Sequence, residues 1–172
     1  MISRILLFMR PILTQTNNYK WWAFSAIAIG AFLTGTSITS SVMILPTVSK
    51  YFSADLPLVQ WVVLANVLTA SVLLLPMGRL SDITNRRQVY LSGLALFVVA
   101  SAVSGFSSHL IMMIVGRTFQ GAGAAMIQAT MTAMIVALFP ERDRGKAIGV
   151  QVTVLGAGMI SGPALGALLS AA

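Results

Sequence analysis

The chain has 172 residues, of which 57% are hydrophobic and only 9% are charged, whereas an ordinary soluble domain carries about a quarter charged residues. It has no cysteine and a single histidine, which excludes disulfides, thiol nucleophiles and Cys- or His-rich metal sites. The net charge of +7 does not indicate nucleic-acid binding, because the basic residues separate apolar runs and do not gather on one solvated face. This composition predicts an all-α membrane protein.

The gaps between charged residues are long enough for membrane-spanning helices, since a hydrocarbon core about 30 Å thick needs roughly 20 residues of helix. The gap between Arg87 and Arg117 contains a polar break, SGFSSH at 104–109, where one helix ends and another begins. We therefore expect a transmembrane bundle over residues 21–172, with spans near 21–46, 57–77, 89–106, 110–138 and 147–170. Residues 1–20 contain Arg10 and Pro11 and no signal-peptide cleavage site, and are predicted to be a cytoplasmic segment at the membrane surface.

The distribution of Lys and Arg predicts how the chain is threaded, because these residues favour the cytoplasmic side of short loops. With a cytoplasmic N-terminus, nine basic residues lie inside: Arg4, Arg10, Lys20, Arg79, Arg86, Arg87, Arg142, Arg144 and Lys146. Only Lys50 lies outside. We expect an integral protein of a bacterial inner (plasma) membrane, with the N-terminus in the cytoplasm and the C-terminus outside.

The first span has a polar stripe. Gly30, Thr34, Ser37 and Ser41 fall within about 40° of one another on a helix. Such a stripe suits a cavity wall, but Ser and Thr hydroxyls often bond the backbone of their own helix. Both interpretations stand at this point.

The stretch GRLSDITNRR, residues 78–87, places three arginines and one aspartate between uncharged runs. We predict a short cytoplasmic loop between the second and third spans. Membrane orientation requires only Lys and Arg, so it does not account for Asp82. One simple role for Asp82 is to cap a helix.

Arg117 is the only charged residue inside a predicted span. A charge near the bilayer centre costs roughly 3 kcal/mol on insertion scales, so such residues usually face a cavity or a partner. On a helix, Gln128 lies about 20° from Arg117 and Gln120 flanks the same face, which is typical of a cavity-lining helix. The alternative is that Arg117 extends to the outer membrane interface.

Three glycines in the fifth span, Gly158, Gly162 and Gly166, repeat every four residues. This spacing predicts a groove into which another helix packs. Pro163 removes one backbone hydrogen bond and is expected to bend the helix. Gly149 lies on the opposite face, so the groove does not account for it.

Three motifs in the expected order resemble the major facilitator superfamily. Residues 78–87 are similar to its signature loop, Gly-x-Leu-(Ala/Ser)-Asp-basic-x-Gly-Arg-(Arg/Lys). RTFQGAGAA at 117–125 is similar to its fourth-span motif, and GVQVTVLGAGMISGPALGA at 149–167 resembles the fifth-span motif associated with antiporters. Residues 57–172 look most like the drug:proton antiporter branch with fourteen spans.

The sequence also departs from the family pattern. Ile83 replaces a basic residue, and Ala167 replaces a glycine. Asn85 stands where glycine is usual, a mild departure because asparagine is the non-glycine residue that best tolerates a left-handed turn. Ser37 stands where the branch usually carries a first-span aspartate. In relatives that carboxylate is taken as a proton-coupling group, and serine cannot titrate.

The resemblance implies a secondary active transporter that exports or exchanges a small organic solute. Protons are the coupling ion of the branch, and Ser37 in place of the aspartate leaves the coupling ion of this chain open. The chain would be a partial N-terminal half of the fold, whose partners are the bilayer, the solute, and the rest of the transporter or another chain. The alternative is a non-transporting bundle, either a truncated remnant or a partner-binding module, because family members build the pathway between two six-span halves. An enzyme is not expected, since the four acidic residues do not gather with a nucleophile or histidine, and no cofactor is expected.

The residue patterns and the resemblance together give three sets of site residues. These are a cytoplasmic gating loop of Gly78, Asp82, Arg86 and Arg87; a cavity or coupling set of Ser37, Arg117, Gln120 and Gln128; and an antiporter-like packing motif of Gly149, Gly158, Gly162, Pro163 and Gly166.

Overall fold

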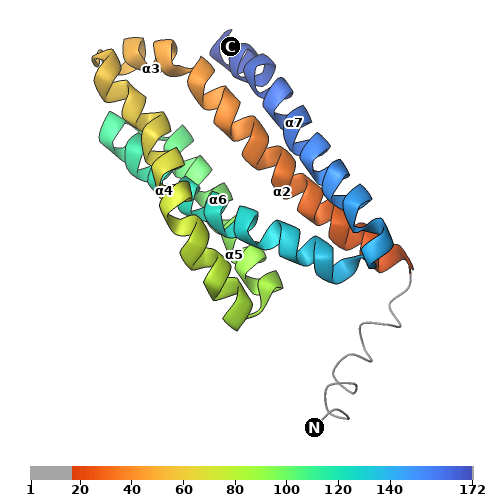
Figure 1. The fold of residues 1–172 in the computed structure, drawn as a ribbon. Helices are drawn as coiled ribbons and strands as arrows, with labels where there is room; N and C mark the ends of the chain where they lie inside the picture. The colour runs from red at the N-terminus through yellow and green to blue at the C-terminus, as the bar shows by residue number, and fades with distance from the viewer. Residues whose placement is uncertain (1–16, 172) are drawn as a thin grey trace.

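The computed structural model describes residues 17–171 (Figure 1). The helices of this part of the chain are α2 (Asn17–Met43), α3 (Leu45–Phe52), α4 (Leu56–Ile83), α5 (Arg86–Gly105), α6 (Leu110–Leu138) and α7 (Glu141–Ala171). All except α3 are long and apolar enough to cross a membrane. The predicted all-α fold with five spans is therefore confirmed. The first sixteen residues of the predicted N-terminal segment lie outside the described range.

The helices extend further than the apolar runs predicted. Helix α4 continues from residue 77 to Ile83 and α5 begins at Arg86, so the predicted loop over residues 78–87 is wrong. Only Thr84 and Asn85 connect the two helices. A hydropathy boundary marks the edge of the bilayer core, whereas backbone hydrogen bonding continues into the interface where water can satisfy the helix ends.

The first span ends at a break after Met43. Ile44 interrupts the helix, and the short helix α3 then begins at Leu45 with Pro46 in its first turn. Proline fits this position because the first backbone N–H groups of a helix have no intrahelical partner. Ser53, the cap residue after α3, has a positive φ of 48°, which closes the turn towards α4.

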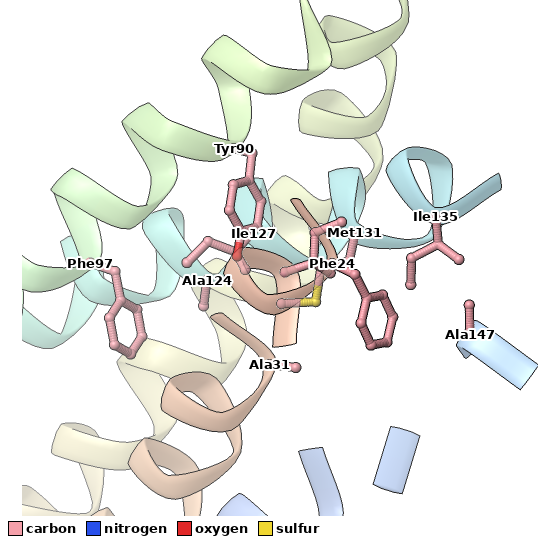
Figure 2. Close-up of a cluster of buried hydrophobic side chains, with 10 residues drawn as sticks. Phe24, Ala31, Tyr90, Phe97, Ala124, Ile127, Met131, Ile135 and Ala147 are labelled. Atoms are coloured by element: carbon pink, nitrogen blue, oxygen red, sulfur yellow. The ribbon is translucent and has the colours of Figure 1, made fainter. Parts of the chain in front are cut away.

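The spans pack as a group of three and a pair. Helix α6 packs against both α4 and α5, while α2 runs side by side with α7 (Figure 1). A buried apolar cluster between α2, α5 and α6 joins the two groups (Figure 2). The Tyr90 hydroxyl of α5 donates a hydrogen bond to the Ala26 carbonyl of α2 at 2.8 Å. The largest members of the cluster are Phe24, Ile27, Tyr90, Phe97, Ile127, Met131 and Ile135.

Glycines mark the places where helices approach backbone to backbone. A Cβ added at Gly158 would lie 2.5 Å from the Phe32 carbonyl oxygen and 3.1 Å from the Thr36 nitrogen. A Cβ added at Gly162 would likewise lie 2.8 Å from the Thr36 carbonyl oxygen. The predicted groove on α7 therefore holds α2, and α7 continues as a helix through Pro163. At Gly149 an added Cβ would meet nothing within 4 Å.

This contrast predicts opposite effects for the same substitution on one helix. Gly158→Ala should destabilise the bundle by roughly 1–3 kcal/mol, because the added methyl group meets backbone atoms that cannot give way. Gly149→Ala should stabilise it by about 0.5–1 kcal/mol, because alanine loses less entropy in a helix. Thermal unfolding of the purified variants in detergent measures both. Equal midpoints would show that Gly158 is not in close contact with α2.

Candidate functional site

Arg117 lies inside the bundle and bonds two polar side chains. Its Nη1 donates to Ser41 Oγ of α2 at 2.6 Å and to Gln120 Oε1, one turn further along α6, at 3.0 Å. These contacts direct the guanidinium towards α2. Bonding by neutral side chains lowers the cost of holding a charge at membrane depth.

Gln120 is the centre of the network around Arg117. Its Oε1 also accepts from Asn66 Nδ2 of α4 at 3.4 Å, and its Nε2 donates to Ser37 Oγ at 3.1 Å and to Ser101 Oγ at 2.7 Å. The amide thereby uses both its acceptor and its donor sites, and its side chain is buried. Asn66 Nδ2 further donates to the backbone carbonyl of Arg117 at 3.2 Å. We call these residues the Arg117 network: Ser37, Ser41, Asn66, Ser101, Arg117 and Gln120.

The serines of the network bond their own helices and the site at once. Ser41 donates to the Ser37 carbonyl at 2.6 Å, and Ser101 donates to the Phe97 carbonyl at 2.7 Å. Their hydroxyl oxygens keep lone pairs that accept from Arg117 and Gln120. Ser41 therefore fits both interpretations of the first-span stripe, because it lines a cavity and also bonds the backbone of its own helix. Thr34 of the same stripe is buried and bonds only carbonyls of α2.

All residues of the network except Asn66 lie in the wall of a cavity of about 760 Å³ between α2, α3, α5 and α6. This volume is within the usual range for small-molecule sites. The polar lining residues are Thr36, Ser37, Ser40, Ser41, Thr47, Tyr51, Ser101, Ser104, Ser107, Arg117 and Gln120. No acidic residue lines the cavity in the part of the chain that the structure describes.

Gln128 does not join the Arg117 network, although the helical angle placed it on the same face. It is exposed and borders a separate cavity of about 190 Å³, together with Ser37 and Asn66. The structure thus brings together Ser37, Arg117 and Gln120 of the predicted set and leaves Gln128 outside it. Asn66 and Ser101 are not among the predicted site residues, although their places as polar residues in long apolar runs could have marked them.

The ion pair at the α4–α5 connection joins three helices. Arg86 Nη2 lies 3.0 Å from Asp82 Oδ1, and Arg86 Nη1 donates to the Ala133 carbonyl of α6 at 3.4 Å. Arg87 is exposed, and no ion pair among the described residues includes it. An added Cβ at Gly78 meets nothing within 4 Å.

The structure shows which residue caps α5 at this connection. Asn85 has φ −93° and ψ 113°, and its Oδ1 accepts from the backbone N–H of Arg87 at 3.0 Å. Asn85 is the N-cap of α5 and does not adopt the left-handed conformation. The connection has only two residues, so the Asn85 side chain is the one in position to accept from the first free N–H groups of α5. Asp82 therefore does not cap α5, and it lies in the last turn of α4.

Comparison with known proteins identifies relatives over most of the chain. The chain is 32% identical over 152 residues to the riboflavin transporter RibZ of Clostridioides difficile, covering 87% of this chain and 33% of that protein. It is 31% identical over 154 residues to the multidrug resistance protein Stp of Mycobacterium tuberculosis (89% and 29% covered). It is 32% identical over 149 residues to the tetracenomycin C resistance and export protein of Streptomyces glaucescens (87% and 28% covered). The chain thus spans about a third of the length of these relatives.

The fold also matches a solved structure. This is the crystal structure of a bacterial homolog to the human lysosomal transporter Spinster, in an inward-facing and unoccupied conformation. The TM-score is 0.75 at 18% sequence identity, with 84% of this chain and 30% of that chain covered. A family model described as Major Facilitator Superfamily matches residues 27–172. With five apolar helices of spanning length, the chain is an integral membrane protein that belongs to the Major Facilitator Superfamily.

Proposed function

We propose that these residues form the first five spans of the N-terminal half of a secondary active transporter for a small organic solute. The observation that carries this proposal is the Arg117 network in the wall of a cavity of about 760 Å³. A charged residue in a membrane bundle that faces a cavity usually lies on a solute or ion pathway. In transporters of this kind the pathway runs near the middle of the membrane, between two halves that move against each other.

Export is the direction that the relatives favour. The names of two of them describe multidrug resistance and the export of tetracenomycin C. Proton coupling through the first span is not part of the proposal, because Ser37 cannot titrate. A coupling ion would have to use another group.

We propose a gating role for the α4–α5 connection, with Gly78, Asp82, Arg86 and Arg87. The Asp82–Arg86 pair is partly exposed, and an exposed ion pair contributes only about 0–1 kcal/mol. Such a contact can break and re-form at a small cost in free energy when the helices rearrange. The hydrogen bond from Arg86 to the Ala133 carbonyl of α6 would break and re-form with it.

Transport in liposomes tests the function. The complete polypeptide that contains residues 1–172 should move a dye, either anionic fluorescein or cationic tetramethylrhodamine methyl ester, against its concentration gradient when a proton or sodium gradient is imposed. Residues 1–172 alone should move neither, because alternating access needs an opposing half. Failure of the complete polypeptide with both dyes under both gradients would favour a non-transporting bundle.

Membrane orientation has its own test. We propose a cytoplasmic N-terminus in a bacterial inner membrane, from the distribution of Lys and Arg. Alkaline phosphatase, which is active only outside the cytoplasm, should be inactive when fused after Asn85 and active when fused after Ala172. Equal activity of the two fusions would contradict five spans with this orientation.

A further inference from the structure

We propose that the cavity beside Arg117 binds the negatively charged group of an organic anion, an inference that rests on the transporter function proposed above. Among the residues that the structure describes, Arg117 is the only formally charged one in the cavity lining. The ion pairs of the described residues join Asp82, Glu141 and Asp143 to arginines near their own helix ends, and none includes Arg117. The fourth acid, Asp55, is the N-cap of α4 and is exposed.

The four acids of the chain are thus all accounted for elsewhere. The cavity therefore keeps the positive charge of Arg117 with only neutral partners. In a medium of low dielectric constant such a charge attracts an anion strongly and repels a cation.

Arg117 keeps a donor for a ligand. Protein side chains occupy Nη1, and no hydrogen bond among the described residues uses Nη2. A guanidinium nitrogen that protein groups leave free can donate to a carboxylate or phosphate oxygen.

The rest of the cavity suits an apolar, flat body. Phe32, Phe52 and Phe97 line it together with Tyr51, and aromatic side chains provide large contact areas for ring systems. The ligand class is therefore an aromatic or similarly apolar molecule with one carboxylate or phosphate group. An acid contributed to Arg117 by residues beyond those described would remove this preference, and the experiment distinguishes that case.

Two dyes with a common ring system but opposite charge test the inference. Binding of fluorescein and of tetramethylrhodamine methyl ester to the complete polypeptide in nanodiscs is followed by fluorescence anisotropy, with empty nanodiscs as background. We expect fluorescein to bind roughly tenfold more tightly or better, as for a close charge pair shielded from water. Equal binding, or tighter binding of the cation, would overturn the inference. If the cation alone is transported, the proposed function stands and this inference fails.

A pair of substitutions at Ser37 separates charge from bulk. Ser37→Asp adds a carboxylate to the cavity wall next to Gln120 and should reduce the ratio of fluorescein to rhodamine affinity roughly tenfold. Ser37→Asn has nearly the same shape without the charge, and should keep fluorescein as the tighter ligand. If the two variants shift the ratio equally, the charge of the cavity does not select the ligand and the inference is wrong.

Discussion

Replacing Arg117 with alanine is expected to reduce transport by the complete polypeptide to the level of protein-free liposomes, with insertion and abundance close to wild type. Transport should be lost because the cavity loses its one charge. The fold should survive because Asn66 bonds the backbone carbonyl at position 117, which alanine keeps. Ser41 also keeps its bond to the Ser37 carbonyl. Removing a charge from a membrane span further lowers the cost of insertion.

The neighbouring residue provides a matched control. Thr118 is exposed on α6 and bonds only the Ile114 carbonyl, so Thr118→Val should transport like wild type. Dye uptake is compared at equal amounts of reconstituted protein, with membrane abundance measured by immunoblot. Arg117→Ala with normal uptake would show that Arg117 is a structural residue and not part of the pathway.

The number and order of the spans could be predicted because they depend on one physical quantity. A bilayer excludes charge over about 20 residues of helix, and the charge-free runs of this chain show that length directly. The ends of the helices could not be predicted in the same way. Ser81 is buried and donates to the Gly78 carbonyl at 2.7 Å, so α4 is still regular where the sequence has already become polar.

The candidate site was predictable along one helix and not between helices. Arg117 and Gln120 are three residues apart, a spacing that brings side chains together on any helix, and the structure confirms their contact. Gln128 lies at nearly the same angle around α6 as Arg117, but about 16 Å from Arg117 along the helix axis. At that position α6 borders a different cavity. Ser101 and Asn66 enter the site because α5 and α4 both pack on α6, which no local pattern indicates.

The glycines of α7 were also predictable along their own helix and not between helices. Their spacing of four residues predicts a groove on α7 without naming the helix that fills it. The partner is α2, whose backbone at Phe32 and Thr36 lies against Gly158 and Gly162. Gly149 lies on the opposite face with open space, and nothing in the described residues explains the glycine there.

Replacing Gln120 with leucine should destabilise the bundle and also impair transport. The substitution removes four hydrogen bonds, to Ser37, Asn66, Ser101 and Arg117. Three of these bonds join different helices, those to Ser37, Asn66 and Ser101. Interhelical hydrogen bonds in membranes contribute about 0.6 kcal/mol each on average, so we expect a loss of roughly 2 kcal/mol. For a chain of this size that lowers the midpoint of thermal unfolding by roughly 4–8 °C.

Gln120→Glu separates the role of Gln120 in stability from its role in transport, because it keeps the shape of the side chain and changes its charge. A carboxylate can still accept from Arg117 and Asn66, and the Ser37 hydroxyl can rotate to donate to it. The unfolding midpoint should therefore stay close to wild type, whereas the new negative charge beside Arg117 should prevent fluorescein transport. The measurements are thermal unfolding in detergent and dye uptake in liposomes. A midpoint for Gln120→Glu as low as that for Gln120→Leu would mean that the donated bonds to Ser37 and Ser101, and not the bonds around Arg117, hold the four helices together.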